Sequence, residues 1–284
     1  MKALLAVVLA LSVLPLARVA RGHAELLLQI EEVTKEIEQD SKTPDLYLKR
    51  GELRRQHVEW ELAHADFDRA QALSPDLAVI DLLRGRLYLD SGWPLSALAC
   101  VNHFLANHPK HAEALIVRAR IRTRLGMRLS AAQDYTGAIA MSSDPGPDLF
   151  IERAQVLVAS GQEYLADALR GLDEGIAKMG SLVTLQLFAI DAELKQKNYD
   201  GALARLDKIA EKSPRKETWL VRRGEILQLA GRPDEARQAY QSALAALQTL
   251  PPTRRFVPAM QELEKRIKRE LENPGGPARA DGAK

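Results

Sequence analysis

Two consecutive stretches of the chain carry the same pattern over the same length. Residues 44–77 read PDLYLKRGELRRQHVEWELAHADFDRAQALSPDL, and residues 78–111 read AVIDLLRGRLYLDSGWPLSALACVNHFLANHPKH. Both 34-residue stretches have an Arg-Gly pair near the start, an alanine twelve residues after that glycine and a proline near the end. A period of about 20–50 residues is the signature of a repeat architecture.

The pattern continues through four further segments, at 112–146, 147–182, 183–216 and 217–250. A small residue follows an arginine in five of the six segments, at Gly51, Gly85, Ala119, Ala154 and Gly224. Twelve residues later comes an alanine in all six: Ala63, Ala97, Ala131, Ala166, Ala202 and Ala236. A larger side chain follows four residues after that in five, at Phe67, Val101, Tyr135, Leu206 and Tyr240. These positions therefore recur along about three quarters of the chain.

This pattern resembles the tetratricopeptide repeat, a helix-turn-helix unit. The resemblance implies an all-α fold, a right-handed α-solenoid of about six such repeats over residues 44–250 with a capping helix at each end. The fourth and fifth repeats depart most, because Arg170 replaces the large apolar residue in one and Ile190 the small residue in the other. Both helices are still expected in each.

Elementary packing agrees with this resemblance. Small residues let the two helices of a repeat approach closely, and the larger residue is expected to fill the gap against the next repeat. Left-handed helix ends are expected at the glycines between the helices, which are Gly92, Gly126, Gly161 and Gly231. Pro94 and Pro233 suit the first turn of a second helix, where the missing N–H costs little.

Both ends of the repeat region carry an apolar stripe with helical spacing. In the predicted N-terminal cap, residues 25–43, the stripe is Leu26, Ile30, Val33 and Ile37. In the predicted C-terminal cap, residues 251–272, it is Met260, Leu263, Ile267 and Leu271. Such stripes indicate amphipathic helices that cover the outer repeats. The Gly-, Pro- and Ala-rich tail, residues 273–284, is predicted to be disordered.

Residues 1–24 have the composition of a signal peptide. Lys2 precedes an apolar run from Ala3 to Leu14, and small residues suit cleavage after Ala24 or after Gly22. The run is shorter than the roughly 20 residues that span a bilayer, so we expect an exported protein, periplasmic or secreted, with no membrane span after cleavage. An uncleaved anchor and a cytosolic protein with an apolar N-terminus are the alternatives. Loss of the three basic residues of this segment changes the net charge from +2 to −1, which disfavours nucleic acid as a partner.

The resemblance also implies where a partner binds, because tetratricopeptide repeats usually hold extended peptides against their first helices. At one such position every repeat has an apolar residue: Leu48, Leu82, Ile116, Ile151, Leu187 and Val221. The first helices would line the concave groove of the solenoid. The polar candidates for partner binding in this groove are Glu52, Arg55, Arg86, Arg120, Arg124, Gln155, Asp191 and Glu225. Arg86, Arg120 and Arg124 would make repeats two and three positive, which favours an acidic partner segment. A solvated face without a partner is the alternative.

Other features have a structural interpretation beside the functional one. The recurring arginines could bind an anionic ligand, but Asp66 and Asp134 lie sixteen residues after Arg50 and Arg118, which predicts ion pairs within a repeat. The only cysteine, Cys100, adjoins the packing position and is expected to be buried and inert. The sequence contains no nucleophile elbow, zinc-protease helix or phosphate-binding loop. We therefore expect a non-enzymatic scaffold without a cofactor, a resident metal or catalytic residues.

We expect this scaffold to be an adaptor that binds a peptide or a partner domain in the concave groove of the repeats, within an envelope assembly or biogenesis complex. Two alternatives to this adaptor remain open from the sequence. One is a structural subunit that forms homo-oligomers through its convex face or end caps; the oligomeric state itself is not predicted. The other is a metal-binding protein that uses the histidines His103, His108 and His111, which lie close together in the sequence.

Overall fold

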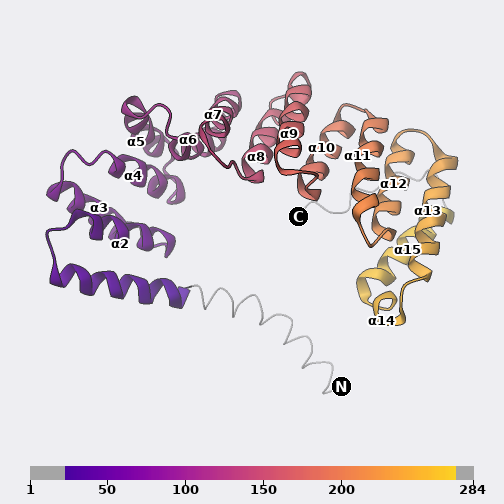
Figure 1. Ribbon diagram of the computed structural model, residues 1–284, viewed down its shortest axis with the longest axis horizontal. Helices are drawn as coiled ribbons and strands as arrows, with labels where there is room; N and C mark the ends of the chain where they lie inside the picture. The colour runs from indigo at the N-terminus through magenta and orange to yellow at the C-terminus, as the bar shows by residue number, and fades with distance from the viewer. Residues whose placement is uncertain (1–22, 273–284) are drawn as a thin grey trace, which may run out of the picture. The chain divides into compact units, whose positions relative to one another are not determined.

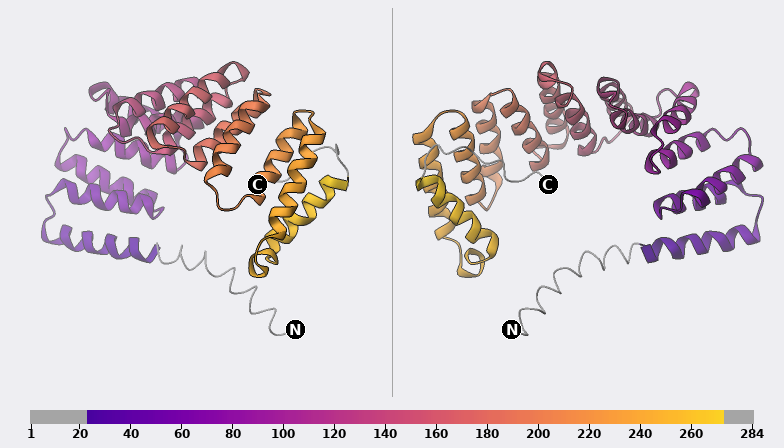
Figure 2. Two further views of the ribbon diagram at one scale, coloured as in Figure 1. Left: turned by 45° about the vertical axis from the view of Figure 1, so that its right-hand side comes forward. Right: turned by 180° about the vertical axis from the view of Figure 1, so that it is seen from behind.

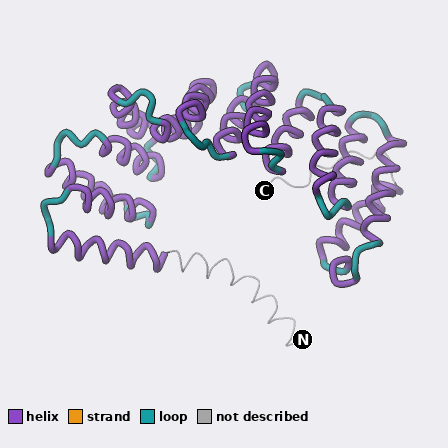
Figure 3. The backbone as a smooth tube through the Cα atoms, in the orientation of Figure 1, coloured by secondary structure: helices purple, strands orange, loops and turns teal. Residues whose placement is uncertain are grey.

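The computed structural model describes residues 23–272, and every regular element in that range is a helix (Figure 3). Nearly all of the predicted leader and the whole predicted disordered tail, residues 273–284, lie outside the described residues. The described chain divides into two compact parts between Ser143 and Asp144. Below they are called the N-terminal part and the C-terminal part.

The N-terminal part begins with a helix over residues 23–39 and continues as three helical hairpins (Figure 1). The hairpins are α2 (Pro44–Gln56) with α3 (Trp60–Leu73), α4 (Val79–Asp90) with α5 (Pro94–Asn107), and α6 (Ala112–Arg124) with α7 (Arg128–Met141). Neighbouring hairpins pack through α3 on α4 and α5 on α6. The first helices α2, α4 and α6 also contact one another in order, so each hairpin stacks on the next.

The C-terminal part contains three more hairpins and a capping helix (Figure 2). The hairpins are α8 (Pro147–Val158) with α9 (Leu165–Met179), α10 (Val183–Lys195) with α11 (Tyr199–Lys212), and α12 (Glu217–Leu229) with α13 (Pro233–Gln248). A 3-10 turn, η1 (Gln162–Tyr164), precedes α9. The short helix α14 (Pro252–Arg255) leads into α15 (Pro258–Glu272), which packs on α13. The predicted class, an all-α solenoid with capping helices, is confirmed.

The recurring small residues are where the two helices of a hairpin touch. A Cβ added at Gly51 would lie 2.6 Å from Cε1 of Phe67, and one at Gly224 would lie 2.7 Å from the ring of Tyr240. Because both partners belong to the same repeat, the large residue fills the space above the small one of its own hairpin. Phe67 also shares a core with Ile80 and Leu87 of α4, so at repeat one the contact within the hairpin accompanies the expected contact with the next repeat.

Repeat four reverses this arrangement. A Cβ at Gly175 in α9 would lie 2.9 Å from the Phe150 ring of α8, and one at Gly171 would lie 2.7 Å from Nη2 of Arg153. The large side chains thus come from the first helix and the small residues from the second. This explains why the repeat tolerates Arg170 at the usual large apolar position, since that side chain is exposed.

The turns inside the hairpins have positive φ, as the four glycines predict. The φ angles are +87° at Gly92, +76° at Gly126, +141° at Gly161 and +71° at Gly231. Val58 and Lys197 take the equivalent places in repeats one and five with φ of 69° and 59°. Pro94 and Pro233 begin α5 and α13.

The end helices bury their apolar stripes. Val33 and Ile37 of the N-terminal helix belong to the core around Phe67. Ile267 of α15 is fully buried in the core around Tyr240. Among residues 23–272, no helix combines the length and the apolar character that a membrane span needs.

Candidate functional site

The predicted groove residues of the N-terminal part lie on three consecutive first helices. Glu52 and Arg55 belong to α2, Arg86 to α4, and Arg120 and Arg124 to α6. Because α2 contacts α4 and α4 contacts α6, these five residues form one surface. We call it the first-helix face.

Three of these side chains form one ion-pair network. Arg55 donates to both carboxylate oxygens of Glu52, from Nε at 3.0 Å and from Nη2 at 2.7 Å. Arg86 lies 3.7 Å from the same carboxylate through Nη1. Arg55 also pairs with Asp90, and Arg86 with Glu113. The first-helix face is therefore mixed in charge around repeat two, where Asp90 and Glu113 accompany the arginines of the expected positive stretch.

Burial affects the two arginines of this network differently. The hydrogen bonds to Glu52 raise the pKa of Arg55 above its usual value. Burial instead lowers the pKa of Arg86, although Glu52 and Asp90 oppose that shift. Arg86 therefore differs from Arg55 in that the loss of hydration on burial outweighs the attraction of its carboxylate neighbours.

The remaining two arginines of the face are exposed on α6. Nη1 of Arg124 donates to the carbonyl oxygen of Leu89 at 2.7 Å. Leu89 lies in the last turn of α4, where unpaired carbonyl groups attract cations. Arg124 therefore ties α6 to the end of α4.

The candidates in the C-terminal part hold separate contacts. Asp191 of α10 accepts from Arg222 at 3.2 Å, and Glu225 of α12 accepts from the same guanidinium at 3.1 Å and also pairs with Arg266 of α15. Gln155 of α8 is exposed. These three residues belong to the C-terminal part and are not members of the first-helix face.

The recurring arginines form the predicted ion pairs. Nη2 of Arg50 donates to Asp66 at 2.7 Å, and Nη2 of Arg118 donates to Asp134 at 2.7 Å. A second arginine one turn later joins each pair, since Nη1 of Arg54 reaches Asp66 and Nη1 of Arg122 reaches Asp134, both at 2.7 Å. The structural interpretation of these arginines is confirmed.

Sequence reasoning did not find the acidic partners Asp90 and Glu113. The signal was the repeat period itself, because Arg55 and Asp90 are 35 residues apart, as are Leu89 and Arg124. Pairs separated by about one period connect equivalent turns of stacked hairpins. A search for opposite charges at that spacing would have found the first of these contacts.

The three clustered histidines have different neighbours. Nδ1 of His103 lies 2.6 Å from Oδ2 of Asp81. The rings of His108 and His111 lie 4.6 Å and 5.0 Å from the Phe104 ring, one stacked and the other edge-on. Within the described residues no group of three or more His, Cys, Asp or Glu side chains is placed to hold a metal ion. The cluster in the sequence is therefore not a cluster of ligands in the fold.

Cys100 is partly buried rather than fully buried as expected. Burial raises the pKa of its thiol, and the nearby Asp81 carboxylate adds to that shift. A raised pKa leaves less thiolate at neutral pH, so the geometry does not favour a nucleophilic or redox role.

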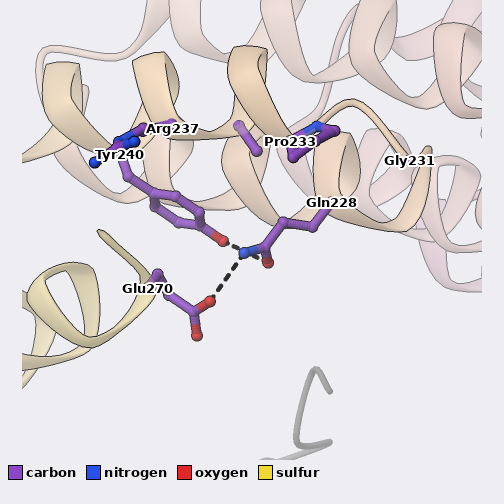
Figure 4. A pocket seen from close by; sticks show the side chains of 7 residues that line it. Gln228, Gly231, Pro233, Arg237, Tyr240 and Glu270 are labelled. Carbon is purple, nitrogen blue, oxygen red and sulfur yellow. Dashed lines mark hydrogen bonds between the residues drawn. The ribbon is translucent and has the colours of Figure 1, made fainter. Parts of the chain in front are cut away.

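One pocket of about 290 Å³ lies between α12, α13 and α15 (Figure 4). The Tyr240 hydroxyl donates to Oε1 of Gln228 at 3.0 Å, and Nε2 of Gln228 donates to Glu270 at 3.0 Å. Burial raises the pKa of Tyr240, which keeps the phenol protonated. These polar groups satisfy one another, so the pocket functions as part of the contact between the cap and repeat six.

Comparison with known proteins agrees with this architecture. Residues 154–261 match the model of a tetratricopeptide repeat-like domain. The C-terminal part of a tetratricopeptide repeat protein from Cytophaga hutchinsonii aligns with 80% of this chain and 92% of its own, at 14% identity and a TM-score of 0.64. The chain has a tetratricopeptide repeat fold.

Two further solved tetratricopeptide repeat folds align over most of their length. A protein from Parabacteroides merdae covers 88% of this chain and 94% of its own, at 19% identity and a TM-score of 0.51. PilF of Pseudomonas aeruginosa covers 78% of this chain and 97% of its own, at 17% identity and a TM-score of 0.52. No curated protein sequence matches the chain. Tetratricopeptide repeats are generally non-catalytic scaffolds for protein interactions, and the matched domain model is of that kind.

Proposed function

We propose that this protein is an exported, non-catalytic adaptor that holds a segment of a partner protein along the first-helix face, within an assembly or biogenesis complex of the cell envelope. The observation that carries the proposal is the row of polar side chains on α2, α4 and α6, with Arg86 at its centre. A repeat face built this way offers the hydrogen-bond donors of four arginines and the carboxylate of Glu52 to an extended chain.

An acidic residue in the partner segment is the best complement for this face. Burial lowers the pKa of Arg86, and its partner Glu113 keeps 58% of its side chain exposed. A carboxylate from a partner could replace Glu113 at the guanidinium without leaving a buried charge unpaired. The exposed Arg120 and Arg124 extend the attraction along α6 and would speed association.

Export rests on the composition of residues 1–24, where a basic start, an apolar run and small residues occur in that order. Cleavage after Ala24 would remove the run and leave the capping helix and the repeats. N-terminal sequencing of the protein purified from its host tests this proposal. A mature start at Glu25 or His23 is expected, and an intact Met1 would contradict cleavage.

Photo-cross-linking in the native host tests the adaptor function. A photoreactive residue is placed at Arg120 or at Thr123 on α6, and at the matched second-helix positions Arg69 on α3 and Arg170 on α9. We expect the α6 positions to capture one or two reproducible envelope proteins that the second-helix positions do not capture. Capture by all four positions alike would contradict binding at this face.

A charge-reversal pair then tests the electrostatics. The double variant Arg120→Glu/Arg124→Glu is compared with Arg170→Glu/Arg237→Glu, which has the same net charge and alters exposed residues of α9 and α13. The first variant is expected to lose the captured partner while its circular dichroism is unchanged. Retention of the partner by the first variant would rule out an acidic segment at this face.

A further inference from the structure

A row of large exposed apolar side chains follows the three hairpin turns of the N-terminal part. The row consists of Val58 and Leu62 at the first turn, Trp93 and Leu95 at the second, and Met127 and Leu129 at the third. Their exposed fractions run from 43% at Met127 to 72% at Leu95. Single exposed apolar residues are normal, whereas a series of six marks an interaction surface. We call this series the turn edge.

The three turns lie beside one another. Arg55, in the last turn of α2, pairs with Asp90 at the end of α4. Arg124, at the end of α6, donates to the Leu89 carbonyl of α4 at 2.7 Å. These two contacts join the ends of the first helices directly before the turns, so the three turns follow one another along one edge of the N-terminal part.

The repeat does not itself require apolar residues here. Trp93 and Met127 occupy the first position after the turn glycine, one period apart. The equivalent residues of repeats one, four, five and six are Glu59, Gln162, Asn198 and Arg232. The hairpin turns of the C-terminal part carry one large exposed apolar residue within the described range, Leu229, so the series of six belongs to the N-terminal part.

The two ends of the turn edge carry opposite charges. Glu61 precedes Leu62 at the first turn, and Arg128 stands between Met127 and Leu129 at the third. Both residues are exposed, and neither has an ion-pair partner within the described range 23–272. Trp93 and Leu95 lie midway between them.

We propose that the turn edge joins two copies of this chain about a two-fold axis through the second turn. A two-fold contact places one surface against itself in the opposite direction. Trp93 and Leu95 of one copy then meet Trp93 and Leu95 of the other. Val58 and Leu62 meet the other copy's Met127 and Leu129, and Glu61 meets the other copy's Arg128.

The same edge laid in the parallel direction would put like charges together, so the charges select the antiparallel dimer. A standard interface buries about 800 Å² on each partner, with aromatic residues at its centre. The exposed Trp93 is suited to that central place. Arg55 and Arg124 of the first-helix face adjoin this edge, whereas Arg86 and Arg120 lie further from the turns on α4 and α6.

The test is the oligomeric state of the protein, expressed from its full coding sequence and purified as the host processes it. Sedimentation velocity over a range of concentrations should give twice the chain mass. Trp93→Glu and Leu95→Glu should each give a single chain mass. Leu229→Glu, which alters a residue of the C-terminal part that is 50% exposed, is the matched control and should remain dimeric.

Charge exchange tests the direction of the dimer. Glu61→Arg alone and Arg128→Glu alone should each raise the dissociation constant by about tenfold or more, because each change acts twice across a two-fold axis. The double variant Glu61→Arg/Arg128→Glu should return it to within about threefold of the unchanged protein. Such recovery is not expected if the two residues do not face each other.

Three results would overturn the proposal. A single chain mass at every concentration would exclude a second copy as the occupant, and co-flotation of that monomer with phospholipid vesicles would assign the edge to a membrane surface. A dimer that survives Trp93→Glu would place the interface elsewhere. None of these results bears on capture of a partner by the first-helix face, so the two proposals fail separately.

Discussion

The two buried aspartates of the N-terminal part show how a single residue organises a hairpin. Asp66 and Asp134 are 3% and 4% exposed, and each accepts hydrogen bonds from two arginines on the preceding helix. A charge at that depth is tolerated only when it is paired and hydrogen-bonded. The arginines, by contrast, keep part of their surface in water, so the aspartate is the sensitive member of each cluster.

Replacing Asp134 by alanine should lower the free energy of unfolding by about 2–3 kcal/mol, because Arg118 and Arg122 would remain half-buried without a carboxylate. Urea titration followed by circular dichroism measures this change. The matched control is Asp207→Ala, since Asp207 pairs with Arg223 but keeps 59% of its side chain exposed. That control should cost less than about 1 kcal/mol; equal losses would contradict the role given to burial.

Cys100 stands where repeats one and three have the buried aspartate, sixteen residues after the arginine. The Arg84 guanidinium instead forms an ion pair with Asp68 and donates a hydrogen bond to the side-chain oxygen of Gln71. Because burial and Asp81 raise the pKa of the thiol, the thiolate fraction at neutral pH is lower than that of an exposed cysteine.

The reaction of Cys100 with a chromogenic disulfide reagent should therefore be slower in the folded protein than in the urea-unfolded protein. We expect a difference of at least about tenfold at pH 7.5. The rate in the folded protein should still be rising above pH 9, since thiolate forms only as the pH approaches the raised pKa. The measured rate can be assigned to Cys100 because the chain has one cysteine. Equal rates in the folded and unfolded chain would contradict the shift.

At the scale of the helix, the distance between the two members of a hairpin depends on one small residue. Gly224 of α12 lies under the ring of Tyr240 of α13, and a Cβ there would approach the ring to 2.7 Å. A fully buried tyrosine held by a hydrogen bond to Gln228 has little freedom to move aside.

Gly224→Ala should consequently lower the free energy of unfolding by about 1–3 kcal/mol, although alanine is the better helix former. Gly137→Ala is the matched control, because Gly137 also lies within a helix and its nearest neighbour would be Cδ1 of Leu115 at 3.3 Å. The control should change stability by less than about 1 kcal/mol. Urea titration compares the two, and a gain in stability for Gly224→Ala would show that the helices separate easily.

The turn of repeat five is strained at Lys197, which has a φ of 59° where repeats two, three, four and six have glycine. Lys197→Gly should raise the free energy of unfolding by up to about 1 kcal/mol, because glycine takes this conformation without a steric penalty. Lys195→Gly, two residues earlier at the last residue of α10, should lower it by up to about 1 kcal/mol. Thermal unfolding of both variants checks the predicted difference in sign.

At the scale of the whole molecule, stability comes from stacking, since no hairpin can bury its own apolar face. The last hairpin of the C-terminal part is closed by α15, where Ile267 is fully buried beside Tyr240 and Leu247. The charged opposite face of α15 stays in water.

Ile267→Ala should lower the free energy of unfolding of the C-terminal part by about 2–4 kcal/mol, through the cavity that it leaves. Trp219 packs against the same core, so its fluorescence in a background with phenylalanine at Trp60 and Trp93 reports on this part. Lys265→Ala, at a residue 71% exposed on the same helix, is the control and should have little effect. A small effect of Ile267→Ala would mean that α15 is not a cap.

Much of the fold was predictable because the same residue pattern occurs in each of several repeats. The small residues, the following alanines and the turn glycines recur at fixed offsets. Ile267 belongs to the apolar stripe of α15, whose members have helical spacing. Each depends on contacts inside one hairpin or on local backbone conformation, which spacing alone encodes. Repeat four was only partly predictable, since Phe150 and Gly175 exchange the usual roles of the two helices.

The candidate site was predictable in position but not in charge. The spacing placed Glu52 and Arg86 on equivalent turns of consecutive first helices. It did not indicate that Asp90 and Glu113 would pair with the arginines. Such partners lie about one repeat away, and long side chains can reach several neighbours at that distance. Which neighbour they reach depends on how the hairpins stack.

The sequence by itself determined the helical hairpins, their order, and the ion pairs of Asp66 and Asp134, because those contacts join residues at a fixed separation within a repeat. Only the tertiary structure decided that Arg55 and Arg124 tie the ends of three first helices together, that the first-helix face is mixed in charge, and that the apolar turns form one edge. Those features join residues of different repeats. Their neighbours follow from the stacking of whole hairpins, which local spacing does not specify.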